Sequence, residues 1–157
     1  MMFKDCSALY KFHGDMGSLE DGENMFEGCN DLDRFVGDLS KLKNGRYMFE
    51  NCGISYFEFV SDLSSLDWGY HMFYNTWLNE ESLIHIAETI KKRSSGNRRE
   101  LHLGLYHGVD LETVKQLLTE IHEKGWDVYV NLQATNSDNQ VEPELFDPAT
   151  GFIAGEV

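Results

Sequence analysis

Three cysteines recur at one position of a repeated pattern in this chain of 157 residues. Cys6, Cys29 and Cys52 follow one another at intervals of 23 residues, and cysteine thiolates are common ligands of structural zinc. Such zinc sites usually take their ligands in close pairs such as Cys-x-x-Cys, which this spacing does not provide. We therefore interpret the three side chains as reduced, buried packing residues. A disulfide between neighbouring units fits the distance that such a bond spans, although an odd number of cysteines leaves at least one thiol free.

Three aspartates recur in the same way, and a row of carboxylates is one way to hold calcium. Asp15, Asp38 and Asp62 each precede an apolar residue. Calcium takes about 6 to 8 oxygen ligands, and these units lack the runs of Asp, Asn and Gly that supply them. We expect each carboxylate to accept backbone N–H groups at a turn instead. The sequence therefore predicts no metal site.

The histidines follow no catalytic or metal-binding pattern. The sequence contains no His-Glu-x-x-His helix, no Gly-x-Ser-x-Gly turn and no glycine-rich phosphate loop. A glycosidase would need two carboxylates about 5 to 9.5 Å apart across a cleft, and no sequence signal selects such a pair. The six histidines are His13, His71, His85, His102, His107 and His122. We therefore expect a protein that is not an enzyme and that uses no cofactor.

The cysteines and aspartates belong to a repeat of the whole sequence. Met-Phe pairs begin at Met2, Met25, Met48 and Met72, at intervals of 23, 23 and 24 residues. Each pair is followed by a cysteine, or by Thr76 in the fourth unit, and then by an apolar residue; the first three units continue with a phenylalanine and an Asp-apolar pair. Self-similarity at this period predicts units that are too small to bury their apolar sides alone and therefore stack on one another.

The pattern Met-Phe-x-x-Cys-x-x-Leu-x-x-Phe-x-x-Asp-Leu-x-x-Leu resembles the leucine-rich repeats of BspA type. These repeats occur in surface proteins of host-associated bacteria and in proteins of their phages. The resemblance covers residues 2 to about 90 and implies a non-enzymatic recognition or structural role, often as one segment of a larger protein. The fourth unit departs from the pattern at Thr76 and continues as a helix pattern after Leu78, so we expect the array of short repeats to end there.

Strand and helix signals give the expected order of elements. Apolar residues bounded by Gly, Asp and Ser predict strands over 9–12, 32–36, 54–59, 101–105 and 128–132. Asn79 and Asp110 are N-cap residues of amphipathic helices expected over 80–93 and 111–123. We expect an α/β fold, namely a right-handed leucine-rich-repeat solenoid with one parallel sheet. Its parts are short repeats of 23–24 residues over 1–78, longer strand-helix units over 79–133 and an acidic tail over 134–157.

Composition limits the partners and the location of the protein. With 27 acidic against 13 basic residues, the formal net charge is -14, which argues against nucleic acid or an anionic membrane as the main partner. No apolar run approaches the roughly 20 residues that span a bilayer. The start of the chain has no signal peptide, so export would depend on an upstream signal or on another route such as lysis in a phage setting. We expect a cell-surface or extracellular location, a virion included, with the cytoplasm as the open alternative.

Two sets of residues are candidates for binding. Trp68, Tyr70, Phe73, Tyr74 and Trp77 crowd the fourth unit; we favour packing for them, with stacking on a sugar or a protein partner as the alternative. The solvent-facing positions of the expected sheet make the better binding face. They are Lys11, His13, Arg34, Val36, Tyr56, Glu58, His102, Tyr129 and Asn131.

Two functions follow from these expectations. The first is a non-catalytic module that binds a protein or a cell-surface macromolecule through the sheet face. The second is a structural component of a larger particle, such as a phage virion or tail protein. The first unit, residues 2–24, has no unit before it in this chain, so we also expect a contact there with upstream sequence or with another subunit.

Overall fold

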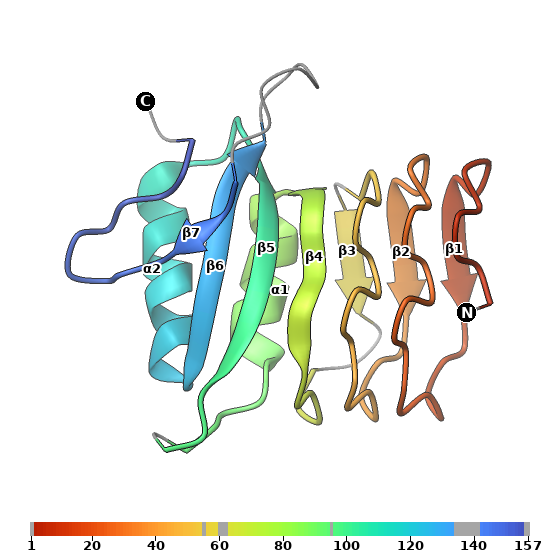
Figure 1. Ribbon diagram of the computed structural model, residues 1–157, viewed down its shortest axis with the longest axis horizontal. Coiled ribbons are helices and arrows are strands. Elements are labelled where there is room, and N and C mark those ends of the chain that lie inside the picture. Colours follow the sequence, from red (N-terminus) through yellow and green to blue (C-terminus); the bar gives the residue numbers. More distant parts are fainter. Residues whose placement is uncertain (1, 55, 60–62, 95, 134–141, 156–157) are drawn as a thin grey trace.

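The computed structural model describes residues 2–54, 56–59, 63–94, 96–133 and 142–155 (Figure 1). Within these ranges the chain forms two helices, α1 and α2, and the strands β1 to β7. In chain order the elements are β1 Lys11–Gly14, β2 Arg34–Gly37, β3 Tyr56–Phe59, β4 Gly69–Leu78, α1 Glu80–Thr89, β5 Arg99–Tyr106, α2 Leu111–Glu123, β6 Trp126–Gln133 and β7 Glu144–Leu145.

The expected leucine-rich-repeat solenoid with one parallel sheet is wrong, because the strands fall into two sheets. β1, β2 and β3 form a parallel three-stranded sheet, and β4, β5, β6 and β7 form a second sheet of four strands. The second sheet is mixed, since β7 pairs antiparallel with β6. β3 and β5, which the solenoid interpretation places in one sheet, are in different sheets. The protein is a small α/β fold in which both helices lie on one face of the second sheet (Figure 1).

The physical reason lies in the fourth unit. Each short unit has two layers, a short strand and an irregular Met-Phe segment, and in the fourth unit the Met-Phe segment becomes the strand. β4 is formed by the Met-Phe segment of that unit, and the Met-Phe segment of the third unit donates backbone hydrogen bonds to it. The N–H of Phe49 bonds to the carbonyl of Met72 at 3.0 Å, and the N–H of Asn51 bonds to that of Tyr74 at 3.0 Å. The layer of Met-Phe segments therefore continues into β4, β5 and β6.

The opposite layer continues as helices. Asn79 accepts a hydrogen bond from the N–H of Ser82 at 2.9 Å and caps α1, so the fourth unit has a helix at the place where the earlier units have a strand. α1 contacts β3 and α2. The sequence shows the capping residue Asn79. It does not show that the helix takes the place of the strand and that the Met-Phe segment continues the sheet.

The strands of the short units begin later than the sequence predicts. β1 and β2 pair in register, with Phe12 opposite Phe35, yet β1 covers 11–14 instead of 9–12. Leu9 lies in a turn, because its N–H bonds to the carbonyl of Cys6 at 3.0 Å, and Leu32 bonds to Cys29 in the same way at 3.0 Å. The apolar residue that marks each unit therefore belongs to the turn before the strand.

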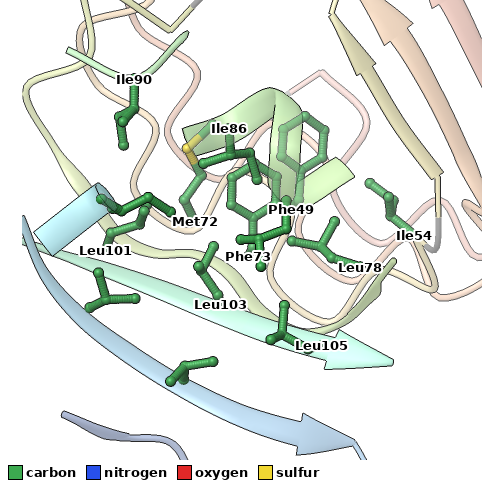
Figure 2. Packing of buried hydrophobic residues seen from close by; sticks show 14 of the residues in the cluster. Phe49, Ile54, Met72, Phe73, Leu78, Ile86, Ile90, Leu101, Leu103 and Leu105 are labelled. Atoms are coloured by element: carbon green, nitrogen blue, oxygen red, sulfur yellow. The ribbon is translucent and has the colours of Figure 1, made fainter. Parts of the chain in front are cut away.

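Stacked phenylalanine rings form the core of the short units. Phe3, Phe26, Phe49 and Phe73 lie one above the next with ring centroids 5.1, 5.5 and 5.6 Å apart. Phe12 and Phe35 stack in a second row at 5.4 Å, and rings of the two rows meet edge to face. Figure 2 shows Phe49 and Phe73 in one buried cluster with Ile86 of α1 and Leu103 of β5. The rows therefore join the short units to the larger α/β part.

The three cysteines are free thiols, but only two are buried. The thiol of Cys29 donates to the carbonyl of Phe3 at 2.9 Å, and the thiol of Cys52 donates to that of Phe26 at 3.0 Å. Cys6 is exposed, so the prediction that all three are buried is wrong for this residue. No residue in the described ranges covers Cys6 as Phe3 covers Cys29. At the same position of the fourth unit, Thr76 bonds to the carbonyls of Phe73 and Gly104 and so links β4 to β5.

The recurring aspartates act at turns where they are described. Asp15 accepts a hydrogen bond from the N–H of Gly17 at 2.9 Å, and Asp38 accepts one from Ser40 at 2.9 Å. These bonds confirm the turn interpretation for both residues. Asp62 lies outside the described residues.

Part of the expected tail packs on the second sheet. The N–H of Phe146 bonds to the carbonyl of Val128 at 2.7 Å, and the N–H of Leu132 bonds to that of Ala154 at 2.8 Å. Phe146, Ile153 and Ala154 are buried. No helix in the described part of the chain has the length and apolar character needed to span a bilayer.

Candidate binding surface

A continuous network of rings covers the face of the second sheet that lies opposite the helices. Side chains alternate along β5, so that Leu101, Leu103 and Leu105 point into the core and His102 points to the other face. We call this network the aromatic strip. It consists of Tyr47, Tyr70, His71, Tyr74, His102 and Tyr129.

The rings of the aromatic strip are in direct contact from the third unit to β6. Tyr47 meets Tyr70 at a centroid distance of 5.5 Å, and Tyr70 stacks on His71 at 4.3 Å. His102 lies 4.7 Å from His71 and stacks on Tyr129 at 4.7 Å. Each ring is thereby held by at least one neighbour, so the strip presents a rigid surface.

Two rings of the strip stand on left-handed backbone. Tyr47 has a φ of 57° and His71 a φ of 54°, and Asn24 occupies the equivalent position of the second unit with a φ of 58°. Asparagine adopts this conformation readily, whereas a bulky residue there costs on the order of 1–3 kcal/mol. The repeat therefore requires the left-handed turn, and at two of these turns the chain places a ring where asparagine is the less strained choice.

The two histidines each hydrogen-bond a carboxylate. Nδ1 of His71 lies 3.2 Å from Oε2 of Glu50, and Nε2 of His102 lies 3.1 Å from Oε2 of Glu100. His102 is only 6% exposed, and burial lowers its pKa, against the opposing effect of the hydrogen bond to Glu100 and with a further lowering by His71. A neutral His102 that donates from Nε2 leaves Nδ1 as an acceptor, and no described residue donates to that buried atom.

A cleft of about 570 Å³ adjoins the strip at Tyr47, Tyr70 and Glu100. We call it the arginine cleft, because Arg46, Arg98 and Arg99 line it. Its floor includes Trp68, whose ring lies 3.5 Å from the guanidinium carbon of Arg99 and 5.1 Å from that of Arg46. At these distances both guanidinium groups make cation–π contacts with the indole.

Two of the three arginines are also paired with carboxylates. Nη2 of Arg46 lies 3.7 Å from Glu23, and Nε of Arg98 lies 2.7 Å from Asp127. Among the described residues, no group of three or more His, Cys, Asp or Glu side chains is arranged to hold a metal ion. The surface is therefore suited to contacts with aromatic, polar and charged groups.

The nine residues of the binding face predicted from sequence do not lie on one sheet. Lys11, His13, Arg34 and Val36 are on β1 and β2, and the first three are exposed. Tyr56 and Glu58 continue the same register on β3, but their side chains are outside the described part. His102, Tyr129 and Asn131 are on β5 and β6 of the other sheet, and of these three His102 and Tyr129 join the aromatic strip.

Several residues of the surface were not predicted as binding residues. Tyr47 and His71 are two of them. A signal for them exists in the sequence, because both occupy the repeat position that Asn24 has in the second unit. The packing interpretation of the aromatic cluster holds for Phe73, which is fully buried. Trp68 and Tyr70, in contrast, each remain 37% exposed.

Comparisons of this chain with protein-family models, with curated proteins and with solved structures find no match. What the protein does must therefore be inferred from its own residues.

Proposed function

We propose that the protein is a non-catalytic recognition module that binds a protein partner through the aromatic strip and the arginine cleft. The observation that carries this proposal is the unbroken contact of six rings, five of them on β4, β5 and β6 of the second sheet and the sixth, Tyr47, on the third unit beside β4. Tyrosine, tryptophan and arginine are the residues that most often dominate binding energy at protein interfaces. Rings that neighbours already hold in place lose little conformational freedom on binding.

The environment of His102 supports binding over proton transfer. A histidine paired with a carboxylate is an arrangement that general bases use. The ring of His102, however, is 6% exposed and is covered by Tyr129 at 4.7 Å and Tyr70 at 4.8 Å. A substrate would have little access to its free nitrogen, whereas Tyr70 and Trp68 are accessible to a partner.

The test compares proteins captured by the immobilised chain and by variants of it. Tyr70→Ala and Tyr129→Ala remove rings from the strip, and Tyr106→Ala removes a ring that is 42% exposed elsewhere on β5. We expect the wild type and Tyr106→Ala to retain the same partner and the two strip variants to lose it. Thermal unfolding shows whether each variant is folded. Retention of the same partner by all four proteins would contradict the proposal, as would capture of a glycan instead of a protein.

A second function, assembly into a larger particle, is favoured by the surface of the first unit. A hollow of about 440 Å³ there is lined mainly by apolar side chains that are only partly buried. The corresponding residues of the second unit, such as Phe26, Phe35 and Leu39, are fully buried. The apolar lining consists of Met2, Phe3, Phe12, Met16, Leu19 and Met25. Upstream sequence or another subunit would cover this hollow as the third unit covers the second.

A further inference from the structure

Arg99 has an environment that differs from those of its neighbours in the arginine cleft. Its guanidinium carbon lies 3.5 Å from the centre of the Trp68 ring, a distance so short that the planar group must stack on the ring, and its Nε atom is buried without a hydrogen-bond partner. Among the described residues, none accepts a side-chain hydrogen bond from Arg99 and none forms an ion pair with it. An arginine has five N–H donors, and donors that stay unpaired in a partly buried place are costly.

The three carboxylates that line the cleft already have partners. Glu23 accepts from Asn44 at 2.9 Å and pairs with Arg46, and Asp127 pairs with Arg98 at 2.7 Å. Glu100 is bonded to His102 at 3.1 Å. Arg99 is therefore the arginine of the cleft that forms no ion pair with a described carboxylate.

We propose that Arg99, held flat on Trp68, binds an aspartate or glutamate side chain of the protein partner in the arginine cleft. This inference rests on the proposed function, in that it takes the partner to be a protein. A guanidinium that stacks on an aromatic ring keeps its N–H edge free, and this planar edge matches the two oxygens of a carboxylate. Because the stack fixes the orientation of the edge, the carboxylate meets donors that are already in position.

Other anionic ligands fit the cleft less well. A sugar acid would gain from stacking on Trp68, but Arg99 and Arg46 already lie against that ring. Inorganic phosphate carries more than one negative charge on average at neutral pH, and Glu23, Glu100 and Asp127 line the same cleft. These carboxylates repel an anionic ligand in the cleft, and the repulsion grows with the charge of the ligand. A single carboxylate on an uncharged peptide has the lowest repulsion.

The test uses small probes in place of the partner. We expect N-acetyl-glutamate N-methylamide, whose only charge is the side-chain carboxylate, to shift the NMR signals of the Trp68 indole N–H and the Arg99 Nε–H in a saturable manner when it is titrated at constant ionic strength. N-acetyl-glutamine N-methylamide, which has the same shape and no charge, should not. Arg99→Gln should abolish the response, and Arg99→Lys, which keeps the charge without the planar edge, should weaken it about tenfold. Lys41→Gln, which removes an exposed charge outside the cleft, should leave it unchanged.

Several results would overturn the inference. These are the absence of a saturable shift in the wild-type protein, an equal shift with N-acetyl-glutamine N-methylamide, or an unchanged shift in a folded Arg99→Gln variant. Tighter binding of inorganic phosphate or of glucuronate than of N-acetyl-glutamate N-methylamide would assign the cleft to a different ligand. The titration needs no partner protein, so a negative result contradicts only the role of Arg99. The capture experiment with Tyr70→Ala and Tyr129→Ala tests the proposed function independently.

Discussion

His102 is the most enclosed titratable group of the aromatic strip. Glu100 faces it from its own strand, His71 and Tyr70 face it from β4, and Tyr129 faces it from β6. Glu50 lies near His71, with its Oε2 atom 3.2 Å from Nδ1 of that ring. Burial favours the neutral imidazole, so the pKa of His102 lies below its ordinary value of 6.5 in the folded protein.

This shift predicts that the protein loses stability in mild acid. Below about pH 6.5 the unfolded chain binds a proton at His102 that the folded chain does not bind, and the free energy of unfolding falls by at most about 1.4 kcal/mol per pH unit. The loss ends at the lower pKa of the folded state, and above pH 6.5 the group contributes no pH dependence. Urea unfolding between pH 5 and 8 measures the slope. His102→Gln should flatten it and His107→Gln, at an exposed position, should not; parallel slopes for wild type and His102→Gln would refute the assignment.

The thiols give a second prediction at the residue scale. Burial raises the pKa of Cys29 and of Cys52, and both thiols donate to backbone carbonyls, whereas Cys6 is exposed. A thiol reagent should therefore label one cysteine rapidly in the native protein and the other two only after denaturation. Cys6→Ser should remove the rapid phase. Rapid labelling of two or three thiols would show that the carbonyl contacts of Phe3 and Phe26 do not protect their partners.

At the scale of elements, one ion-pair group joins the start of β4 to the end of α1. Asp67 accepts from Nζ of Lys91 at 2.7 Å and from Nη1 of Arg93 at 3.1 Å. The side chain of Arg93 is 4% exposed, and its guanidinium also lies 5.2 Å from the ring of Trp126. The hydrogen bond to Lys91, followed by that to Arg93, holds the pKa of Asp67 below its usual range.

Replacement of Asp67 should cost more than replacement of Lys91. Asp67→Ala leaves the buried guanidinium of Arg93 without its carboxylate, and we expect the free energy of unfolding to fall by about 2 kcal/mol, less than for a fully buried pair because Asp67 is 34% exposed. Lys91→Ala removes a half-exposed partner and should cost less than about 1 kcal/mol. Chemical denaturation of both variants measures the difference. Equal losses would mean that the charge of Arg93 is satisfied without Asp67.

The same group explains why the first helix is shorter than its sequence pattern. The capping residue and the apolar spacing predict a helix over 80–93, and α1 ends at Thr89. Lys91 leaves the helix to reach Asp67, and the N–H of Arg93 bonds to the carbonyl of Lys124 at 2.6 Å. α2 covers the predicted residues 111–123, and the long-range bonds at its end, such as that from Arg98 to the carbonyl of His122 at 3.2 Å, leave its length as the sequence predicts. Local signals set helix starts, and contacts distant in the sequence set this helix end.

At the scale of the molecule, the period of the repeat was readable from sequence but the arrangement of the sheets was not. Recurring positions such as Phe26 and Phe49 locate the units, because each must stack on the next. Which layer becomes the larger sheet depends on the fourth unit, where Asn79 starts a helix in one layer and Gly69–Leu78 extends as a strand in the other. The aromatic strip depends on this change of layer at the fourth unit, because the new strand β4 lies beside Tyr47 of the third unit. Ring contacts between Tyr47, His71 and His102 therefore could not be predicted from spacing alone.

The apolar hollow of the first unit gives the last prediction. Met2 is 73% exposed, and Phe3 and Phe12 end two rows of stacked rings whose other members are fully buried. Because uncovered apolar surface favours association, we expect the isolated 157-residue chain to self-associate with rising concentration through this unit. Light scattering and sedimentation measure the molar mass, and hydrogen exchange reports whether the amides of β1 become protected as the chain associates.

Charges placed in the hollow should prevent this association. Met16 and Leu19 line the hollow at partly buried positions, so Met16→Lys with Leu19→Lys should give a monomer that remains folded. Ile84→Lys is the matched control, because it places a charge on a side chain of α1 that is 37% exposed and far from this unit in the sequence. The control should associate as the wild type does. A wild-type chain that is monomeric at all concentrations, with amides of β1 as protected as those of β2, would show that the first unit needs no covering partner and would remove the support for the assembly function.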